Sequence, residues 1–124
     1  MSLFEVRISG NPSFGVSRVI ANTLTHLDAH YLDGQRDALA IVVDYLDRAL
    51  WFVKGRVLSE LDQNMVAITL TPSEDLTEQQ RLAFVHAAFH AFEDVIGDLN
   101  NLSYIKIIQC NASFIHYKRD HAPT

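Results

Sequence analysis

Two pairs of histidines have the spacing of metal ligands. His26 and His30 form one pair, and His86 and His90 form the other, with Glu93 close behind. Residues four apart on a helix lie on one face, which is how helices present imidazoles to zinc or iron. Both pairs fall on the flank of an apolar stripe, where half-exposed histidines are ordinary, and no His-Glu-x-x-His signature is present. We therefore expect no bound metal.

A cluster of positively charged residues near the end of the chain is a second candidate functional site. Lys118, Arg119 and His121 suit the binding of an anionic ligand, and equally suit a solvated tail. No Ser-His-Asp set has a local signature, and the scattered glycines form no phosphate-binding loop. The single cysteine, Cys110, has no basic neighbour that would activate it, so we expect a buried, inert thiol.

Size and charge narrow the classes of function. The 124 residues suffice for a single domain, 1–124, and a hydrophobic content of 48% supplies its core. Ten Lys and Arg against fifteen Asp and Glu leave a formal charge of -5, which argues against a nucleic-acid partner. No apolar run is long enough to span a membrane, and no secretory signal opens the chain. With one cysteine, we expect a cytoplasmic protein that binds neither nucleic acid nor membrane.

The first third of the chain predicts a strand followed by a helix. Leu3 to Ser9 alternates apolar and polar side chains, the period of a strand with one buried face. From Val16 to Tyr31, apolar residues recur at the three- and four-residue spacing of a helix. Asn11 or Ser13 is placed to cap this helix, and Gly34 to end it in a left-handed conformation.

The middle of the chain is open to two interpretations. Ala38 to Tyr45 is apolar and β-branched, and Trp51 to Leu61 alternates in part, which predicts two strands before a third at Met65 to Thr71. The competing interpretation is one long helix from Arg36 to Leu61, with Gly55 inside it. Period alone does not separate the two for such short apolar runs.

A second helix is predicted after a capping box. Thr77 and Gln80 have the residue types and spacing of that motif, and an apolar stripe runs from Leu82 to Leu99. Apolar character extends to a second flank that includes Phe84 and Ala88, which is wider than one sheet face needs. We expect the helix to end at Asn100-Asn101.

Two further strands, Ser103 to Cys110 and Ala112 to Tyr117, complete the order β-α-β-β-β-α-β-β. This order predicts an α+β, two-layer sandwich in which two helices pack on one face of a mixed sheet. A sheet covered on one side, together with the surplus apolar flank of the second helix, indicates self-association.

Several segments carry a family resemblance that covers nearly the whole chain. Met1–Val6 is similar to a first strand, Met65–Leu70 and Leu76–Arg81 to a central strand and the entry to a second helix. Ile107–Gln109 and Tyr117–Arg119 resemble a last strand and a basic C-terminal segment. In their order and spacing, these segments resemble the tautomerase superfamily, specifically the 5-carboxymethyl-2-hydroxymuconate isomerase family.

The resemblance implies a tautomerase-like fold, assembled as a homotrimer with active sites between subunits. It also implies that the terminal nitrogen freed by removal of Met1 is a general base, with its pKa lowered by burial. Position 2 is Ser2 instead of the family's proline, so that base would be a primary amine. The second strand lacks the family's arginine. The remaining candidates to bind a substrate carboxylate are Arg36, Arg48, Lys118 and Arg119.

We therefore expect a tautomerase-like isomerase, divergent at its N-terminus, that acts on a small unsaturated keto or enol carboxylic acid. Proton transfer by the Ser2 amine would need no metal or organic cofactor. The alternative is a non-catalytic oligomeric module of the same fold that binds a ligand or a partner protein. The missing proline and the wide apolar flank of the second helix favour this alternative.

Overall fold

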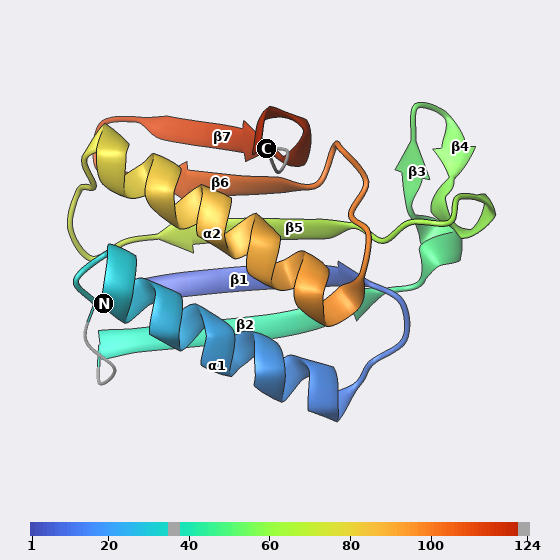
Figure 1. The fold of residues 1–124 in the computed structure, drawn as a ribbon, viewed down its shortest axis with the longest axis horizontal. Coiled ribbons are helices and arrows are strands. Elements are labelled where there is room, and N and C mark those ends of the chain that lie inside the picture. The colour runs from blue at the N-terminus through green and yellow to red at the C-terminus, as the bar shows by residue number, and fades with distance from the viewer. Residues whose placement is uncertain (35–37, 122–124) are drawn as a thin grey trace.

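The computed structural model describes residues 1–34 and 38–121, and it contains one mixed sheet, two long helices and a small separate hairpin. Both helices lie across the same face of the sheet (Figure 1). The strand order is β2-β1-β5-β6-β7. In chain order the elements are β1 Ser2–Ser9, α1 Phe14–Tyr31, β2 Leu39–Leu46, β3 Phe52–Val53, β4 Arg56–Val57, β5 Val66–Thr71, α2 Glu78–Ile96, β6 Tyr104–Ile108 and β7 Ser113–Tyr117. The predicted α+β, two-layer arrangement is confirmed.

The sheet is built from two similar halves. In each half a strand, a helix and a second strand follow one another, and the two strands pair in parallel: β1 with β2, and β5 with β6. The halves join through antiparallel pairing of β1 with β5, in which Leu3 lies opposite Thr71 and Ile8 opposite Val66. As a result β1 and β5 begin at opposite ends of the sheet. We call these the Ser2 end and the hairpin end, since the β3–β4 hairpin extends from the latter (Figure 1).

The core lies between the helices and the inner face of the sheet. Alternate residues of β1 and β5 point into it, as the period of a strand requires. The side chains that fill it most completely are aromatic: Phe4, Phe84, Phe89 and Phe92. The outer face has no helix over it, and it exposes Val42, Ile108 and Ile115.

The sequence prediction for residues 51–61 is wrong in part. Instead of a strand of the main sheet, this segment forms the β3–β4 hairpin, with the short helices η2, Arg48–Leu50, and η3, Leu58–Glu60, on either side. Lys54 and Gly55 form a two-residue turn with φ values of 52° and 80°, the left-handed geometry that matches the twist of a tight hairpin. The competing prediction of one long helix is also wrong, because β2 and this hairpin occupy its range.

The capping residues at the start of both helices were predicted from the sequence, but the residue that ends α1 was not. Ser13 caps α1, and Thr77 and Gln80 form the predicted capping box of α2. After α1 it is Asp33, with φ of 53°, that takes the left-handed conformation instead of Gly34. Gly34 is required for space, because a Cβ there would overlap the buried carboxylate of Asp28.

The C-terminal part of α2 and its apolar flank also differ from expectation. The helix ends at Ile96, where Gly97 adopts a φ of 86°, before the predicted stop at Asn100-Asn101. Phe84 and Ala88, predicted to form a surplus flank, are fully buried in the core, whereas Leu82 is 42% exposed. That flank therefore carries no argument for self-association. In the part of the chain that the structure describes, neither helix is long and apolar enough to cross a membrane.

The capping box predicts a measurable contribution to stability. The Thr77 hydroxyl accepts a hydrogen bond from the Gln80 N–H at 3.1 Å, so Thr77→Ala should lower the free energy of unfolding by about 1 kcal/mol. Thr77→Ser keeps the hydroxyl and should unfold like the parent protein. Urea denaturation measures both, and equal stability of Thr77→Ala and Thr77→Ser would contradict the assignment.

Two histidines near the end of the described chain have a pKa below the ordinary histidine value. His116 of β7 and His121 of η4, Lys118–His121, lie with ring centroids 5.5 Å apart. Burial, followed by the charges of His121 and Arg81, lowers the pKa of His116, and Asp120 opposes this. Burial also lowers the pKa of His121, where Asp120 opposes the shift and His86 adds to it. The folded protein therefore favours both imidazoles in the neutral form.

This protonation predicts a loss of stability in mild acid. Below pH 6.5, the ordinary histidine value, the unfolded chain takes up protons before the folded one does. Stability from these groups should be present above that pH and fall as pH decreases toward the folded-state pKa. His116→Gln should show a weaker fall in melting temperature between pH 7 and pH 5 than the parent. Exposed His90→Gln is the matched control, and identical pH profiles for all three proteins would refute the prediction.

Candidate functional site

Ser2 occupies the first position of β1, an inner strand of the sheet, and is 5% exposed. It pairs with Leu39 of β2 on one side, while its neighbour Leu3 pairs with Thr71 of β5 on the other. Its hydroxyl oxygen accepts a hydrogen bond from the Ser73 N–H at 3.1 Å and lies 3.5 Å from the Ser73 hydroxyl. Backbone pairing on both sides thus fixes the position of the second residue of the chain, and the loop after β5 contacts its side chain.

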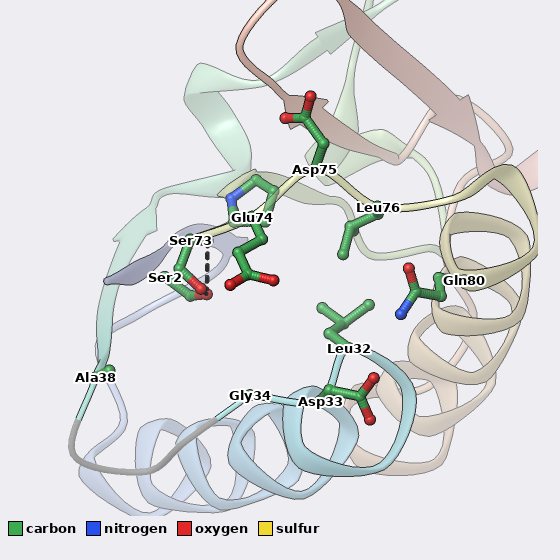
Figure 2. Close-up of a pocket in the computed structure, with 11 residues that line it drawn as sticks. Ser2, Leu32, Asp33, Gly34, Ala38, Ser73, Glu74, Asp75, Leu76 and Gln80 are labelled. Atoms are coloured by element: carbon green, nitrogen blue, oxygen red, sulfur yellow. Dashed lines mark hydrogen bonds between the residues drawn. The ribbon is translucent and has the colours of Figure 1, made fainter.

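A pocket of about 350 Å³ opens beside Ser2. Its lining comes from the start of β1, the end of α1, the start of β2 and the loop between β5 and α2, as Figure 2 shows. Leu32 and Leu76 face each other across one side of it. We call this the Ser2 pocket. Its volume lies at the lower end of the range for small-molecule sites.

The loop that forms one wall of the Ser2 pocket is held in place by hydrogen bonds. The Gln109 side-chain oxygen accepts from the Leu76 N–H at 2.8 Å, and the Arg81 guanidinium donates to the Leu76 carbonyl at 2.9 Å. Gln80 accepts from the Thr77 N–H through its side-chain oxygen, and its amide group faces the pocket (Figure 2). This wall of the pocket is therefore held by hydrogen bonds within the chain.

The Ser2 pocket is acidic. Asp33, Glu74 and Asp75 line it, and no Lys or Arg does so within residues 1–34 and 38–121. The Glu74 carboxylate lies beside Ser2 and points into the hollow, whereas that of Asp75 points away (Figure 2) and accepts from the Cys110 N–H at 3.3 Å. Negative charge at this position attracts cations and repels a carboxylate ligand.

The cations predicted to bind substrate do not surround Ser2. Arg36 lies outside the described residues. Arg48 follows the end of β2, where it donates to the carbonyl oxygens of Leu61 and Gln63, both at 2.7 Å. This guanidinium links the end of β2 to the segment that leads into β5.

Lys118 and Arg119 also lie at the hairpin end. They follow Tyr117, whose partner Tyr104 pairs in turn with Ala67 near the start of β5. Lys118 is 6% exposed, and its ammonium lies 3.4 Å from a Glu93 carboxylate oxygen. Arg119 is exposed. Of the predicted substrate-binding cations within the described residues, only Arg119 is both exposed and able to meet a ligand.

Two cations that sequence reasoning missed lie close to Arg119. Lys54 lies in the turn of the β3–β4 hairpin and Arg56 follows it at the start of β4. The side chains of Lys54, Arg56 and Arg119 line a second hollow of about 320 Å³. The signal was the Lys-Gly-Arg sequence at 54–56, typical of a charged turn. In an alternating segment, however, the same residues also fit a strand that continues without a turn.

The histidine pairs do not converge. His26, His30, His86 and His90 are all exposed, and His90 lies 3.8 Å from the Asp94 carboxylate one turn away. Within the described residues, no group of three or more His, Cys, Asp or Glu side chains is placed to hold a metal ion. Cys110, expected to be buried, is exposed.

Comparison by sequence finds no matching protein-family model and no matching curated protein. Comparison by structure finds clear neighbours. Pt0534 inactivated by 2-oxo-3-pentynoate aligns with a TM-score of 0.74 and 10% identity, covering 87% of this chain and 85% of that one. A fused 4-OT wild-type symmetric trimer aligns with a TM-score of 0.69 and 13% identity, and the match covers 89% of this chain and 85% of that one. N1, a member of the cis-3-chloroacrylic acid dehalogenase family, aligns with a TM-score of 0.68 and 18% identity, and the match covers 86% of this chain and 74% of that one.

These neighbours are members of the tautomerase superfamily. At such low identity they establish the fold: this chain has the tautomerase-like fold that the resemblance implied. The narrower resemblance to the 5-carboxymethyl-2-hydroxymuconate isomerase family stays a prediction.

The contrast between Arg48 and Arg119 can be tested by stability. Arg48→Ala removes the donor from two carbonyl oxygens and should lower the free energy of unfolding by about 2 kcal/mol. Arg119→Ala, at an exposed position, should change it by less than about 0.5 kcal/mol. Chemical denaturation of the two variants measures this difference. An Arg48→Ala protein as stable as the parent would mean that this guanidinium is free for another role.

Proposed function

We propose that this chain catalyses proton transfer within a small unsaturated keto or enol carboxylic acid, with the amine of Ser2 as the base after Met1 is removed. The observation that carries the proposal is the place of Ser2. It is the buried first residue of β1, an inner strand of the sheet, and it lies beside a pocket of about 350 Å³. Removal of Met1, which is 75% exposed, would leave the Ser2 nitrogen at that pocket as a primary amine.

The chemistry balances without an added reagent. The neutral amine takes a proton from the enol oxygen or from a carbon of the substrate, and the ammonium formed returns a proton to a second carbon. Substrate and product are isomers, and no electrons are gained or lost, so the step requires no metal or organic cofactor. The Gln80 amide, which faces the pocket, is placed to donate a hydrogen bond to the oxygen on which negative charge develops.

The electrostatics of the Ser2 pocket require a cation from beyond its described lining. Burial would lower the pKa of the amine, but Asp33 and Glu74 would raise it by favouring the ammonium form. They would also oppose a substrate carboxylate. A cation from a neighbouring chain would correct both effects. Arg119 of a neighbouring chain is our candidate, and Arg36, outside the described residues, stays a candidate from the same chain.

A homotrimer would bring the two ends of the sheet together. The Ser2 end carries the acidic pocket and the hairpin end carries exposed cations, so head-to-tail contact around a ring pairs opposite charges. The helix-free face of the sheet exposes Val42, Ile108 and Ile115, apolar area that such an assembly would bury. Among the structural neighbours, fused 4-OT is described as a symmetric trimer.

A second candidate function is a non-catalytic binding module of the same fold. The acidic lining of the Ser2 pocket favours it, since that charge holds an amine in its protonated form and suits a cationic ligand. Ser2 in place of proline points the same way. Such a module would keep its ligand whatever the state of the N-terminal nitrogen.

The test uses variants that separate the amine from the hydroxyl of Ser2. Mass spectrometry should show Met1 removed, and the processed protein should turn over enol acids, followed by loss of their ultraviolet absorbance. An uncleaved N-terminal extension converts the amine to an amide and should lower turnover by about a hundredfold or more. Ser2→Ala keeps the amine and should stay active, as should Ser2→Pro.

Each outcome decides between the candidates. No turnover of enol acids by protein with a free Ser2 amine would refute the enzymatic proposal. Loss of turnover in Ser2→Ala would assign the chemistry to the hydroxyl instead. Ligand binding that survives the N-terminal extension, in a protein without turnover, would support the binding module.

A further inference from the structure

Three cations from separate elements line one groove at the hairpin end. Lys54 lies in the hairpin turn, Arg56 begins β4, and Arg119 lies in η4. All three are exposed. We call this hollow of about 320 Å³ the basic groove. Figure 1 shows the hairpin that carries two of these cations beside the loop that leads from α2 to β6.

The positive charge of the basic groove is not neutralised by its own lining. Among the described residues that line it, none is Asp or Glu. Arg119 lies 3.9 Å from Asp120, an exposed pair that contributes little. Three further cations at this end are already bound: Arg48 to carbonyl oxygens, Lys118 to Glu93 and Arg7 to Asp44. In a chain with a net charge of -5, a site of this kind concentrates positive potential where an anion can use it.

The floor of the basic groove is preformed and partly apolar. The Asn100 side chain donates to the Gln63 side-chain oxygen at 3.0 Å and accepts from the Leu102 N–H at 2.9 Å, so its orientation is fixed. Val53, Leu61 and Leu102 add apolar surface, and Val53 is only 7% exposed. The left-handed Lys54-Gly55 turn holds the hairpin in register. A site with fixed walls loses little entropy when a ligand binds.

We propose that the basic groove is a binding site for a small organic anion, with a carboxylate or phosphate group held by Lys54, Arg56 and Arg119. The apolar part of the ligand packs on Val53, Leu61 and Leu102. Arg56 and Arg119 can bind the anion through two N–H groups each, whereas Lys54 supplies a point charge. The groove and the Ser2 pocket lie at opposite ends of one subunit, so the proposal does not need the Ser2 amine. In the proposed trimer Arg119 of one chain would also serve the Ser2 pocket of the next, so Lys54 and Arg56 are the cations that belong to the groove alone.

The single tryptophan offers an intrinsic probe of this site. Trp51 packs against the apolar cluster of Val53, Leu58 and Met65 behind the groove. Titration with benzoate should give a saturable change in its fluorescence and a matching heat by calorimetry, weakened by added salt. Benzyl alcohol, its neutral analogue, should give neither. Inorganic phosphate should bind more weakly than benzoate, and equal affinity would remove the apolar part of the proposal.

Exposed charge variants locate the site without risk to the fold. Lys54→Gln and Arg56→Gln should each weaken benzoate binding by about fivefold, and the double variant by more. Arg18→Gln, an exposed change on α1, is the matched control and should bind like the parent. An N-terminal extension that blocks the Ser2 amine should also leave binding unchanged.

These measurements distinguish the failure of the anion site in the basic groove from the failure of the proposed Ser2 chemistry. No saturable response to benzoate, or equal affinity of the double variant and the parent, would overturn the anion site. Loss of enol turnover by the extension with benzoate affinity retained would support both proposals independently. Loss of benzoate binding in the extended protein would place the anion at the Ser2 pocket and refute the basic groove.

Discussion

The antiparallel pairing of β1 with β5 is the constraint on which the rest of the structure depends. Each half of the chain is a strand-helix-strand unit with parallel strands. Such a unit buries only one face of its strands, and the two units share a core because β1 and β5 exchange backbone hydrogen bonds along Leu3–Ile8. Antiparallel pairing places the first residues of the two units at opposite ends of one sheet. A site built at the start of β1 therefore lies at one end, and the start of β5 lies at the other.

The two ends of the sheet also differ in charge. The Ser2 end collects Asp33, Glu74 and Asp75 around its pocket, and the hairpin end collects the exposed cations. Among the described residues, the buried strand start and the exposed cations of the basic groove lie at opposite ends of one subunit, too far apart to act on one small molecule. Contact between subunits is the simplest way to join them, and the helix-free face of the sheet leaves apolar surface available for it. The same separation allows each end to bind a ligand of its own.

Much of the fold was predictable from local pattern. The alternation in β1 and the capping box of α2 report on neighbours within a few residues in sequence, and both were confirmed. The β3–β4 hairpin was missed because a Lys-Gly turn in an alternating segment resembles an interrupted strand. The flank of α2 was misjudged because Phe84 and Ala88 fill space between helix and sheet that no helical projection describes.

The sequence by itself determined the two helices and the five strands of the main sheet, their order, and the place of Ser2 next to the start of a strand. These features depend on the period of side chains and on local hydrogen bonding. Only the tertiary structure decided which cations are available. Arg48 and Lys118 looked as suitable for a ligand as Arg119, yet one binds the carbonyls of a distant loop and the other meets Glu93 of α2. Lys54 and Arg56 join Arg119 only because the hairpin folds beside η4. A side chain's charge is written in the sequence, but its partners come from segments far along the chain, and those partners determine what that charge can bind.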